Sequence, residues 1–327
     1  MRSRRRQLLA AIAIGALWPL AACHPHVKGL TKEKTMQKYP LKPYAVGRYL
    51  VDLPEAATEV SWGQRIKGTD FTWRPATKEQ YLGLLSAREQ ELEGSDAATR
   101  LLLNAEEGTV PQSRILLFEE DTNRDGFLQF EAYRYSEEFN GYLFMTSAVD
   151  RARVGGVRAS VNKILNLIQP RSFDPYITDR GACFDHAFVS GVDPANFENA
   201  AVMVSFNDIN LSFSTQVIDA VDTGPTLLER STIVDRFPEV TLLRQSAREV
   251  ARLNGEELAF KNEPGSGLIS HAFKWDFRGK PNSIMAPRMY ARLNIGHEVA
   301  AALLPDEELL GLWDAVLGSI RLRTGAV

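Results

Sequence analysis

The stretches ILNLIQPR, residues 164–171, and VLGSIRLR, residues 316–323, decide how this chain is divided. Both finish an apolar helical pattern, and both carry Leu, Ile and Arg in matching places. Each also closes a block of roughly 130 to 150 residues, which is a common size for one domain. We therefore predict two similar domains, residues 44–172 and residues 173–327.

Both blocks contain short apolar and aromatic runs bounded by turn residues, which is the pattern of β-strands. Representative runs are EVSWGQRI (59–66), FLQFEAYRY (127–135), GACFDHAFVSG (181–191), NLSFSTQVID (210–219) and SHAFKWDFRG (270–279). Apolar residues at helical spacing predict helices between such runs. The expected helices cover 77–94, with Thr77 as N-cap, 157–168, 226–237 and 305–323. The predicted fold class is α+β, with an antiparallel sheet and packed helices in each domain.

The first 23 residues, MRSRRRQLLAAIAIGALWPLAAC, predict export from the cytoplasm. A basic start is followed by an apolar run that is shorter than the ~20 residues of a mature transmembrane helix, and then by small residues. Residues 20–23, LAAC, resemble the lipobox of bacterial lipoproteins, in which cleavage leaves a lipid-modified cysteine at the N-terminus. We predict a lipoprotein signal peptide at 1–22 and lipidation of Cys23. A soluble secreted protein and an uncleaved membrane anchor are the alternatives.

The residues after the predicted cleavage site indicate where the protein is held. Residues 23–43 are polar and contain three prolines, so we predict a tether between the lipid and the first domain. The residue after Cys23 is His24 rather than Asp, which favours the outer membrane by resemblance to proteobacterial lipoproteins. The expected location is the periplasm, with the lipid anchor in the outer membrane.

Composition and motifs exclude several classes of protein. Without residues 1–22 the formal net charge changes from −3 to −7, which argues against a nucleic-acid partner. The chain contains no Walker loop and no GxGxxG, GxSxG or HExxH motif. We predict that the protein is not an enzyme and uses no cofactor.

The segment DTNRDGFLQFE, residues 121–131, begins like a calcium-binding loop. Asp121 and Asp125 stand at the first and fifth positions, but the twelfth position is Ala132 where a bidentate Glu is required. Because the flanking runs are strand-like, an Asp-Gly hairpin turn explains the segment better, and no metal site is predicted. The exposed tip with Asp121 and Asp125 is a candidate for partner binding.

Cys183 is the only other cysteine, so it has no disulfide partner once Cys23 carries lipid. Its surroundings are aromatic, and we interpret it as a small buried residue rather than a nucleophile. If residues 181–191 form one strand, Cys183 and Asp185 share a face and His186 points to the other. That arrangement counts against a Cys–His catalyst.

Several segments together resemble the lipoprotein immunity proteins that neutralise phospholipase effectors of the type VI secretion system. They are GRYLVDLP (47–54), PYITDRGACFDHAF (175–188), LNGEEL (253–258), HAFKW (271–275) and LWDAVLGSIRLR (312–323). The resemblance covers nearly the whole chain after the signal peptide. It implies a two-domain α+β inhibitor without catalytic residues, whose partner is a cognate secreted phospholipase.

The residues that would contact such a partner do not follow from the sequence. Trp62, Trp73 and Trp275 are candidate aromatic anchors, although Trp in a strand is more often part of the core. A cleft between the domains is another candidate. The alternative function is a structural or assembly lipoprotein of the cell envelope, and a periplasmic hydrolase is a third possibility.

Overall fold

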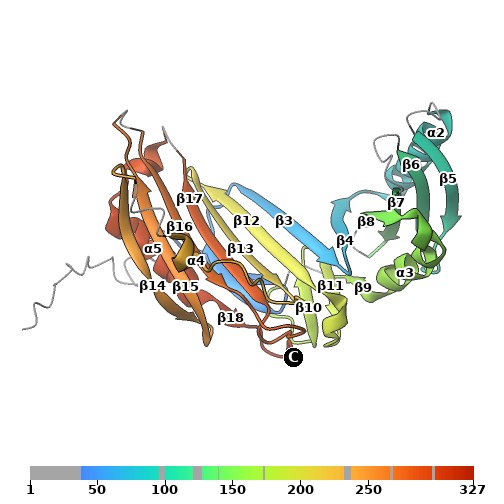
Figure 1. Cartoon of the computed structure of the whole chain (residues 1–327). Helices are drawn as coiled ribbons and strands as arrows, with labels where there is room; N and C mark the ends of the chain where they lie inside the picture. The colour runs from blue at the N-terminus through green and yellow to red at the C-terminus, as the bar shows by residue number, and fades with distance from the viewer. Residues whose placement is uncertain are drawn as a thin grey trace, which may run out of the picture.

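Figure 1 shows a larger and a smaller lobe joined by a narrow bridge. The computed structural model describes residues 38–95, 100–120, 127–138, 140–171, 174–231, 237–265, 268–296 and 299–327. The predicted signal peptide, Cys23, Asp121 and Asp125 lie outside these ranges, so their roles stay predictions. No helix in the described part of the chain is long and apolar enough to cross a membrane.

Twelve strands form one antiparallel sheet that runs through both lobes. In the larger lobe its order is β14 (Val240–Val250), β15 (Leu253–Asn262), β16 (Ser270–Phe277), β17 (Arg288–Ile295), β13 (Ile209–Gln216), β12 (Asn199–Phe206) and β3 (Glu59–Ile66). In the smaller lobe it continues through β4 (Thr69–Pro75), β8 (Gly141–Asp150), β7 (Phe127–Ser136), β6 (Ser113–Glu120) and β5 (Arg100–Glu107). The prediction of antiparallel sheet with packed helices is confirmed. A separate sheet in each domain is wrong, because the β3–β4 hairpin joins the two.

Two further sheets of three strands each lie in the described part of the chain. One consists of β1 (Leu41–Val46), β2 (Tyr49–Pro54) and β18 (Arg321–Leu322), and the other of β10 (Gly181–Phe184), β11 (Ala187–Ser190) and β9 (Ile168–Pro170). β1 and β2 pack on β12 and β13, and β18 pairs with β2. Residues 41–66 therefore belong to the larger lobe in space, although they precede the predicted boundary at 172 and 173.

The larger lobe covers one face of its sheet and leaves the other open. Alternate residues of its central strands are buried, namely Val202, Val204, Leu211, Phe213, Met289, Ala291 and Leu293. α5 (Asp306–Ser319) lies over this face, and its Trp313 ring packs 6.0 Å from the ring of Phe273. Trp275 is fully buried on the same face, which makes it a core residue rather than an anchor. The alternation of buried and exposed residues along these strands is typical of a sheet with one covered face and one open face.

The smaller lobe carries a helix on each face of its sheet. α2 (Lys78–Gly94) covers an aromatic cluster of Tyr81, Tyr133, Tyr135 and Tyr142, and α3 (Val154–Leu167) buries Val161, Ile164 and Leu165 on the other face. The predicted N-cap at Thr77 is confirmed, because its hydroxyl accepts from the Gln80 backbone and the Gln80 side chain accepts from the Thr77 N–H. Further helical segments in the described part of the chain are α4 (Leu227–Ser231) and the 3₁₀ turns Arg151–Arg153, Pro194–Asn196 and Ala300–Leu303.

The matched sequence stretches end in two buried arginines that hold the same connecting segment. Arg171 follows β9 and donates to the carbonyls of Phe184, Ala187 and Asp174. Arg323 follows β18 and donates to the carbonyls of Ile177, Asp179 and Gly181. Both side chains therefore fix residues 174–187, which connect the helix end of the first block to the larger lobe. Their matching places in the sequence reflect this shared role.

His271 in β16 makes the stability of the larger lobe depend on pH. Its side chain is buried, its Nε2 lies 3.1 Å from Asp306 Oδ1, and its Nδ1 has no hydrogen-bond partner among the described residues. Burial, partly offset by Asp306, lowers the pKa of His271 below its usual 6.5. The unfolded chain then binds the proton more readily, so this group makes the free energy of unfolding decrease as the pH falls below 6.5.

We expect His271→Gln to flatten the dependence of unfolding free energy on pH between about 7 and 5.5. Urea unfolding at a series of pH values measures this slope. A variant whose slope equals that of the original chain would contradict the assignment.

Candidate functional site

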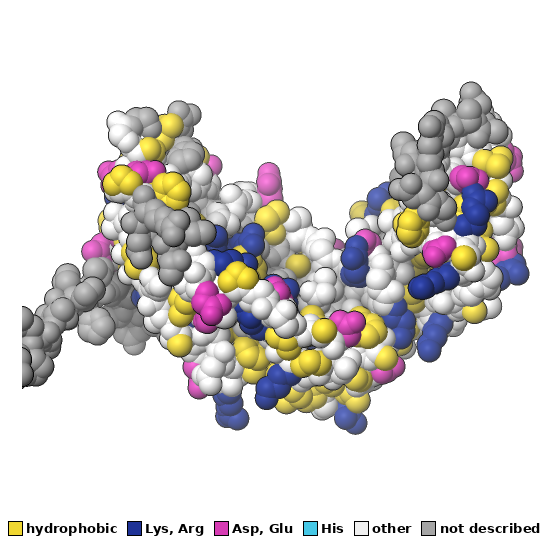
Figure 2. Space-filling model, in the orientation of Figure 1, with side chains coloured by type: hydrophobic (Ala, Val, Ile, Leu, Met, Phe, Trp, Pro, Cys, Tyr) yellow, Lys and Arg dark blue, Asp and Glu magenta, His cyan; other side chains and the backbone are white. Residues whose placement is uncertain are grey.

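The two lobes stand apart because β3 and β4 diverge. β3 pairs with β12 from Glu59 to Arg65, but it pairs with β4 only at Arg65–Asp70 and Ile66–Thr69. The turn between them is Lys67-Gly68, with φ values of 51° and 79°, and glycine adopts such values without strain. β4 then pairs with β8 in the smaller lobe. Figure 1 shows the two lobes standing apart, and Figure 2 shows the hollow between them.

The point where β3 and β4 part, which we call the fork, contacts the β10–β11 hairpin. Gln64, which is buried, donates from Nε2 to the Phe71 carbonyl at 3.5 Å and accepts from the Asp185 N–H at 2.7 Å. The rings of Phe71 and Phe184 meet edge to face at 5.1 Å. Beyond the last backbone pair of β3 and β4, the Gln64 side chain therefore links β4 to the Asp185 turn.

The contact with Gln64 corrects one sequence prediction. Residues 181–191 are not one strand but the hairpin β10–β11, whose turn is Asp185-His186 with φ of 48° at His186. The turn forms because it docks into the fork, which is a contact that local patterning does not encode. Cys183 is fully buried beside the turn, and burial raises the pKa of its thiol. This confirms the interpretation of Cys183 as a core residue.

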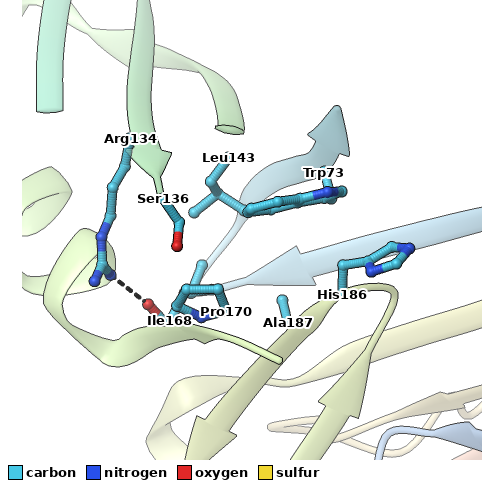
Figure 3. A pocket seen from close by; sticks show the side chains of 8 residues that line it. All are labelled: Trp73, Arg134, Ser136, Leu143, Ile168, Pro170, His186 and Ala187. Atoms are coloured by element: carbon cyan, nitrogen blue, oxygen red, sulfur yellow. Dashed lines mark hydrogen bonds between the residues drawn. The ribbon is translucent and has the colours of Figure 1, made fainter. Parts of the chain in front are cut away.

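A small pocket lies beneath the fork where the lobes meet (Figure 3). Trp73 and His186 lie beside each other on one side, with ring centroids 6.0 Å apart. Arg134 lies on the other side and donates to the carbonyls of Leu165 and Ile168 at 2.8 and 2.7 Å. The free volume is about 10 Å³, which is close to the minimum for one water molecule and far below that of a ligand pocket. This pocket is part of the bridge between the lobes.

A second, larger hollow lies on the open face of the larger lobe, and we call it the arginine hollow. It is lined by Asn199, Ala201, Ser214, Gln216, Arg230, Asp276, Arg288, Tyr290 and Arg292, with a volume of about 420 Å³. The guanidinium carbon of Arg292 lies 4.1 Å from the centre of the Tyr290 ring. Arg288 reaches Asp222 at 3.9 Å and Arg230 reaches Asp276 at 4.0 Å, so neither pair is tight. Figure 2 shows basic side chains gathered on this face near α4.

The electrostatics of the arginine hollow indicate surplus positive charge. Asp276 is 6% exposed, its Oδ1 has no hydrogen-bond partner within the described ranges, and burial raises its pKa. The neighbouring Lys274 has a lowered pKa, first because of burial and then because of Arg292 and Arg230. Cations that depress one another's protonation are not fully neutralised by local acids. The hollow therefore favours an acidic group from a partner, although the whole chain is acidic.

The structure separates the residues considered as anchors. Trp62 and Trp73 are half-buried and lie on the two diverging strands, whereas Trp275 belongs to the core. The arginine hollow was missed at the sequence level. Its one local signal was the alternation of Arg288, Tyr290 and Arg292, which places three polar side chains on one face of a strand. Across the described ranges, no group of three His, Cys, Asp or Glu side chains could hold a metal ion.

Comparison with known proteins relates this architecture to bacterial immunity. The C-terminal domain of Tle cognate immunity protein 4 matches residues 177–325, and its N-terminal domain matches residues 42–152. These matches define the class as an immunity protein. The chain belongs to the family of Tle cognate immunity protein 4, a phospholipase immunity family of type VI secretion.

Solved structures show the same fold. The immunity protein TplEi of type VI secretion from Pseudomonas aeruginosa, in its apo form, is 22% identical, with a TM-score of 0.75 over 89% of this chain and 100% of that chain. The immunity protein in the Tle4–Tli4 complex is 21% identical, with a TM-score of 0.76 over 88% of this chain and 98% of that chain. No curated protein sequence matches the chain.

Proposed function

We propose that this chain binds and inhibits a type VI secretion phospholipase effector in the hollow between its lobes. The divergence of β3 and β4 carries the proposal, because it holds the two lobes apart and leaves a concave surface between them. A stable inhibitory interface needs about 1,600 Å² of buried surface, which a concave face supplies more readily than a flat one. A protein of the same fold, Tli4, has been solved as a complex with Tle4.

The open face of the larger lobe extends the proposed interface. The arginine hollow places two guanidinium groups, that of the half-buried Arg288 and that of the exposed Arg292, beside Tyr290 on this face. Arg and Tyr are enriched among the residues that dominate binding energy at interfaces. Basic groups on an otherwise acidic protein also orient an approaching partner that is acidic at the matching place.

The proposed site of action is the periplasm, with Cys23 lipidated and held in the outer membrane. The order of charged, apolar and small residues before Cys23 supports this location. The first described residue, Lys38, contacts Glu308 at the start of α5, so a tether from Cys23 would enter at the larger lobe. Anchoring raises the local concentration of an inhibitor near the membrane that its target attacks.

A binding role rather than catalysis fits the sites that the structure contains. The pocket beneath the fork is too small for a substrate, and the lining of the arginine hollow contains no His or Cys that could serve Ser214 as a catalytic base or act as a thiol nucleophile. We infer that the protein acts through surface complementarity and carries out no reaction of its own. The alternative of a structural envelope lipoprotein is not favoured by the family match.

The test is direct inhibition of the phospholipase. We expect the chain without residues 1–22 to form a stable complex with its cognate phospholipase effector and to abolish phospholipid hydrolysis at equimolar concentration. Calorimetry and release of fatty acid from vesicles measure the two effects. Full lipase activity in the presence of excess protein would refute the proposal.

A variant of the predicted anchor tests location separately from binding. We expect Cys23→Ser cells to lose acyl labelling of the protein and part of their protection against periplasmic delivery of the lipase. The purified Cys23→Ser chain should still inhibit the enzyme in solution, because the binding surface is unchanged. Continued acyl labelling of this variant would contradict the anchor alone.

A further inference from the structure

β3 presents backbone hydrogen-bonding groups to the hollow between the lobes. In an antiparallel ladder, the N–H and C=O of successive residues point alternately to the two neighbouring strands. The two-residue turn Lys67-Gly68 makes Ile66 and Thr69 the closing pair, so the Ile66 backbone groups face β4. Counting back in steps of two, the groups of Val60 face the same side, whereas Ser61 and Gly63 direct theirs to β12.

No strand of the described chain occupies this side of β3 at Val60. β4 has turned away after Thr69 and Asp70, and Figure 1 shows β3 along the side of the larger lobe that faces the hollow. The Val60 side chain is 42% exposed, and Glu59, Ser61 and Gly63 are exposed as well. This stretch of β3 is therefore an accessible strand edge in the middle of the long sheet.

The other two edges of the twelve-stranded sheet are protected and this one is not. β14 has a register shift between Leu242 and Arg244, and β5 has one between Leu102 and Asn104. Such bulges are a common means of preventing a strand from joining an edge. The register of β3 with β12 is continuous from Glu59 to Arg65. A regular, exposed edge is a template on which another chain can add a strand.

We propose that an extended segment of the phospholipase effector adds to β3 as a further strand, pairing at Val60. This inference rests on the proposed function and specifies how the hollow binds its partner. Strand addition uses backbone groups for affinity and alternate side chains for specificity. The segment would place an apolar side chain beside Val60 and larger side chains next to Ser61 and Gly63, which are small and exposed.

The first test compares two substitutions at one position. Val60→Pro removes the N–H that would donate to the effector strand, and it leaves the β12 ladder intact because that N–H points to the hollow. We expect effector binding to weaken about tenfold or more, since the partner carbonyl would be left unsatisfied. Val60→Ala keeps the N–H and is the matched control, which should bind within about twofold of the original chain. Calorimetry measures affinity, and circular dichroism confirms the fold of each variant.

The second test observes the Val60 amide directly and does not depend on folding of the proline variant. In the intact chain with saturating effector, the hydrogen exchange of the Val60 amide should slow strongly, whereas the Ser61 amide is already protected by β12. Tight effector binding with a fast Val60 amide would overturn strand addition and leave the proposed function standing. A slow Val60 amide in the free chain would also overturn it, because a second copy or another segment of the chain would then occupy the edge; sedimentation velocity separates these two.

Discussion

Glu198→Gln is expected to lower the free energy of unfolding by about 3–5 kcal/mol, the largest effect of any single substitution considered. Glu198 and Arg48 are 4% and 3% exposed, and the guanidinium donates to both carboxylate oxygens at 2.7 and 3.0 Å. Arg48 also donates to the carbonyls of Gly191 and Ala326. Neutralising the carboxylate leaves a buried cation without a counter-ion and puts an amide NH₂ opposite a guanidinium N–H, which is far costlier than losing one hydrogen bond.

The exposed pair Arg65–Asp70 provides the matched control for Glu198→Gln. Its hydrogen bonds are also bidentate, at 2.6 and 2.8 Å, but both side chains are about half exposed. Asp70→Asn should therefore change stability by no more than about 1 kcal/mol. Chemical denaturation of the two variants measures the difference, and equal losses for both would show that burial does not govern these pairs.

Reversing the charge of the arginine hollow is expected to weaken effector binding by about 100-fold. Arg288→Glu combined with Arg292→Glu replaces two cations by two anions beside Tyr290, and like charges facing each other across an interface cost several kcal/mol. Most of the loss at low salt should appear as slower association. The association rate of the original chain should fall as ionic strength rises, and that of the variant should depend on salt less.

Arg321→Glu is the control for the charge-reversal experiment. Arg321 is part-exposed and pairs with Asp52 in the small sheet that packs on the covered face, away from the arginine hollow. Its reversal changes net charge in the same direction and should alter effector binding by less than about threefold. Surface plasmon resonance at several salt concentrations compares the variants. Similar losses for both faces would mean that net charge, and not the arginine hollow, governs association.

Local elements were largely predictable from the sequence, as the smaller lobe illustrates. The Thr77 hydroxyl and the Gln80 amide are three residues apart, so the start of α2 is encoded within four positions. The turn at Asn207-Asp208 joins two alternating strands, β12 and β13, and both residues have positive φ there. The buried Trp275 follows from its place in an alternating strand. The contribution of Asp121 and Asp125 to partner binding is still a prediction.

The candidate site was much less predictable, because each part depends on long-range pairing. Alternation shows which side chains of β3 share a face, but it does not show that β12, more than 130 residues later, is the neighbour. The Asp185-His186 turn depends on Gln64, and the arginine hollow brings Arg230 of α4 to Arg288 of β17. Such long-range contacts form only when the whole lobe packs, so the local sequence around each residue does not predict them.

The sequence by itself determined the spans of most strands and helices, the export pattern before Cys23 and the immunity family. Hydrophobic periodicity, helix caps and turn residues depend on neighbours a few positions away, so a single sequence is enough to predict them. Only the tertiary structure decided that one sheet crosses both lobes, that β3 and β4 part to open a hollow, and that Arg48 and Glu198 pair in the interior. The order of the strands and the burial of charged side chains depend on contacts between segments that are far apart in the sequence, so no local stretch determines them.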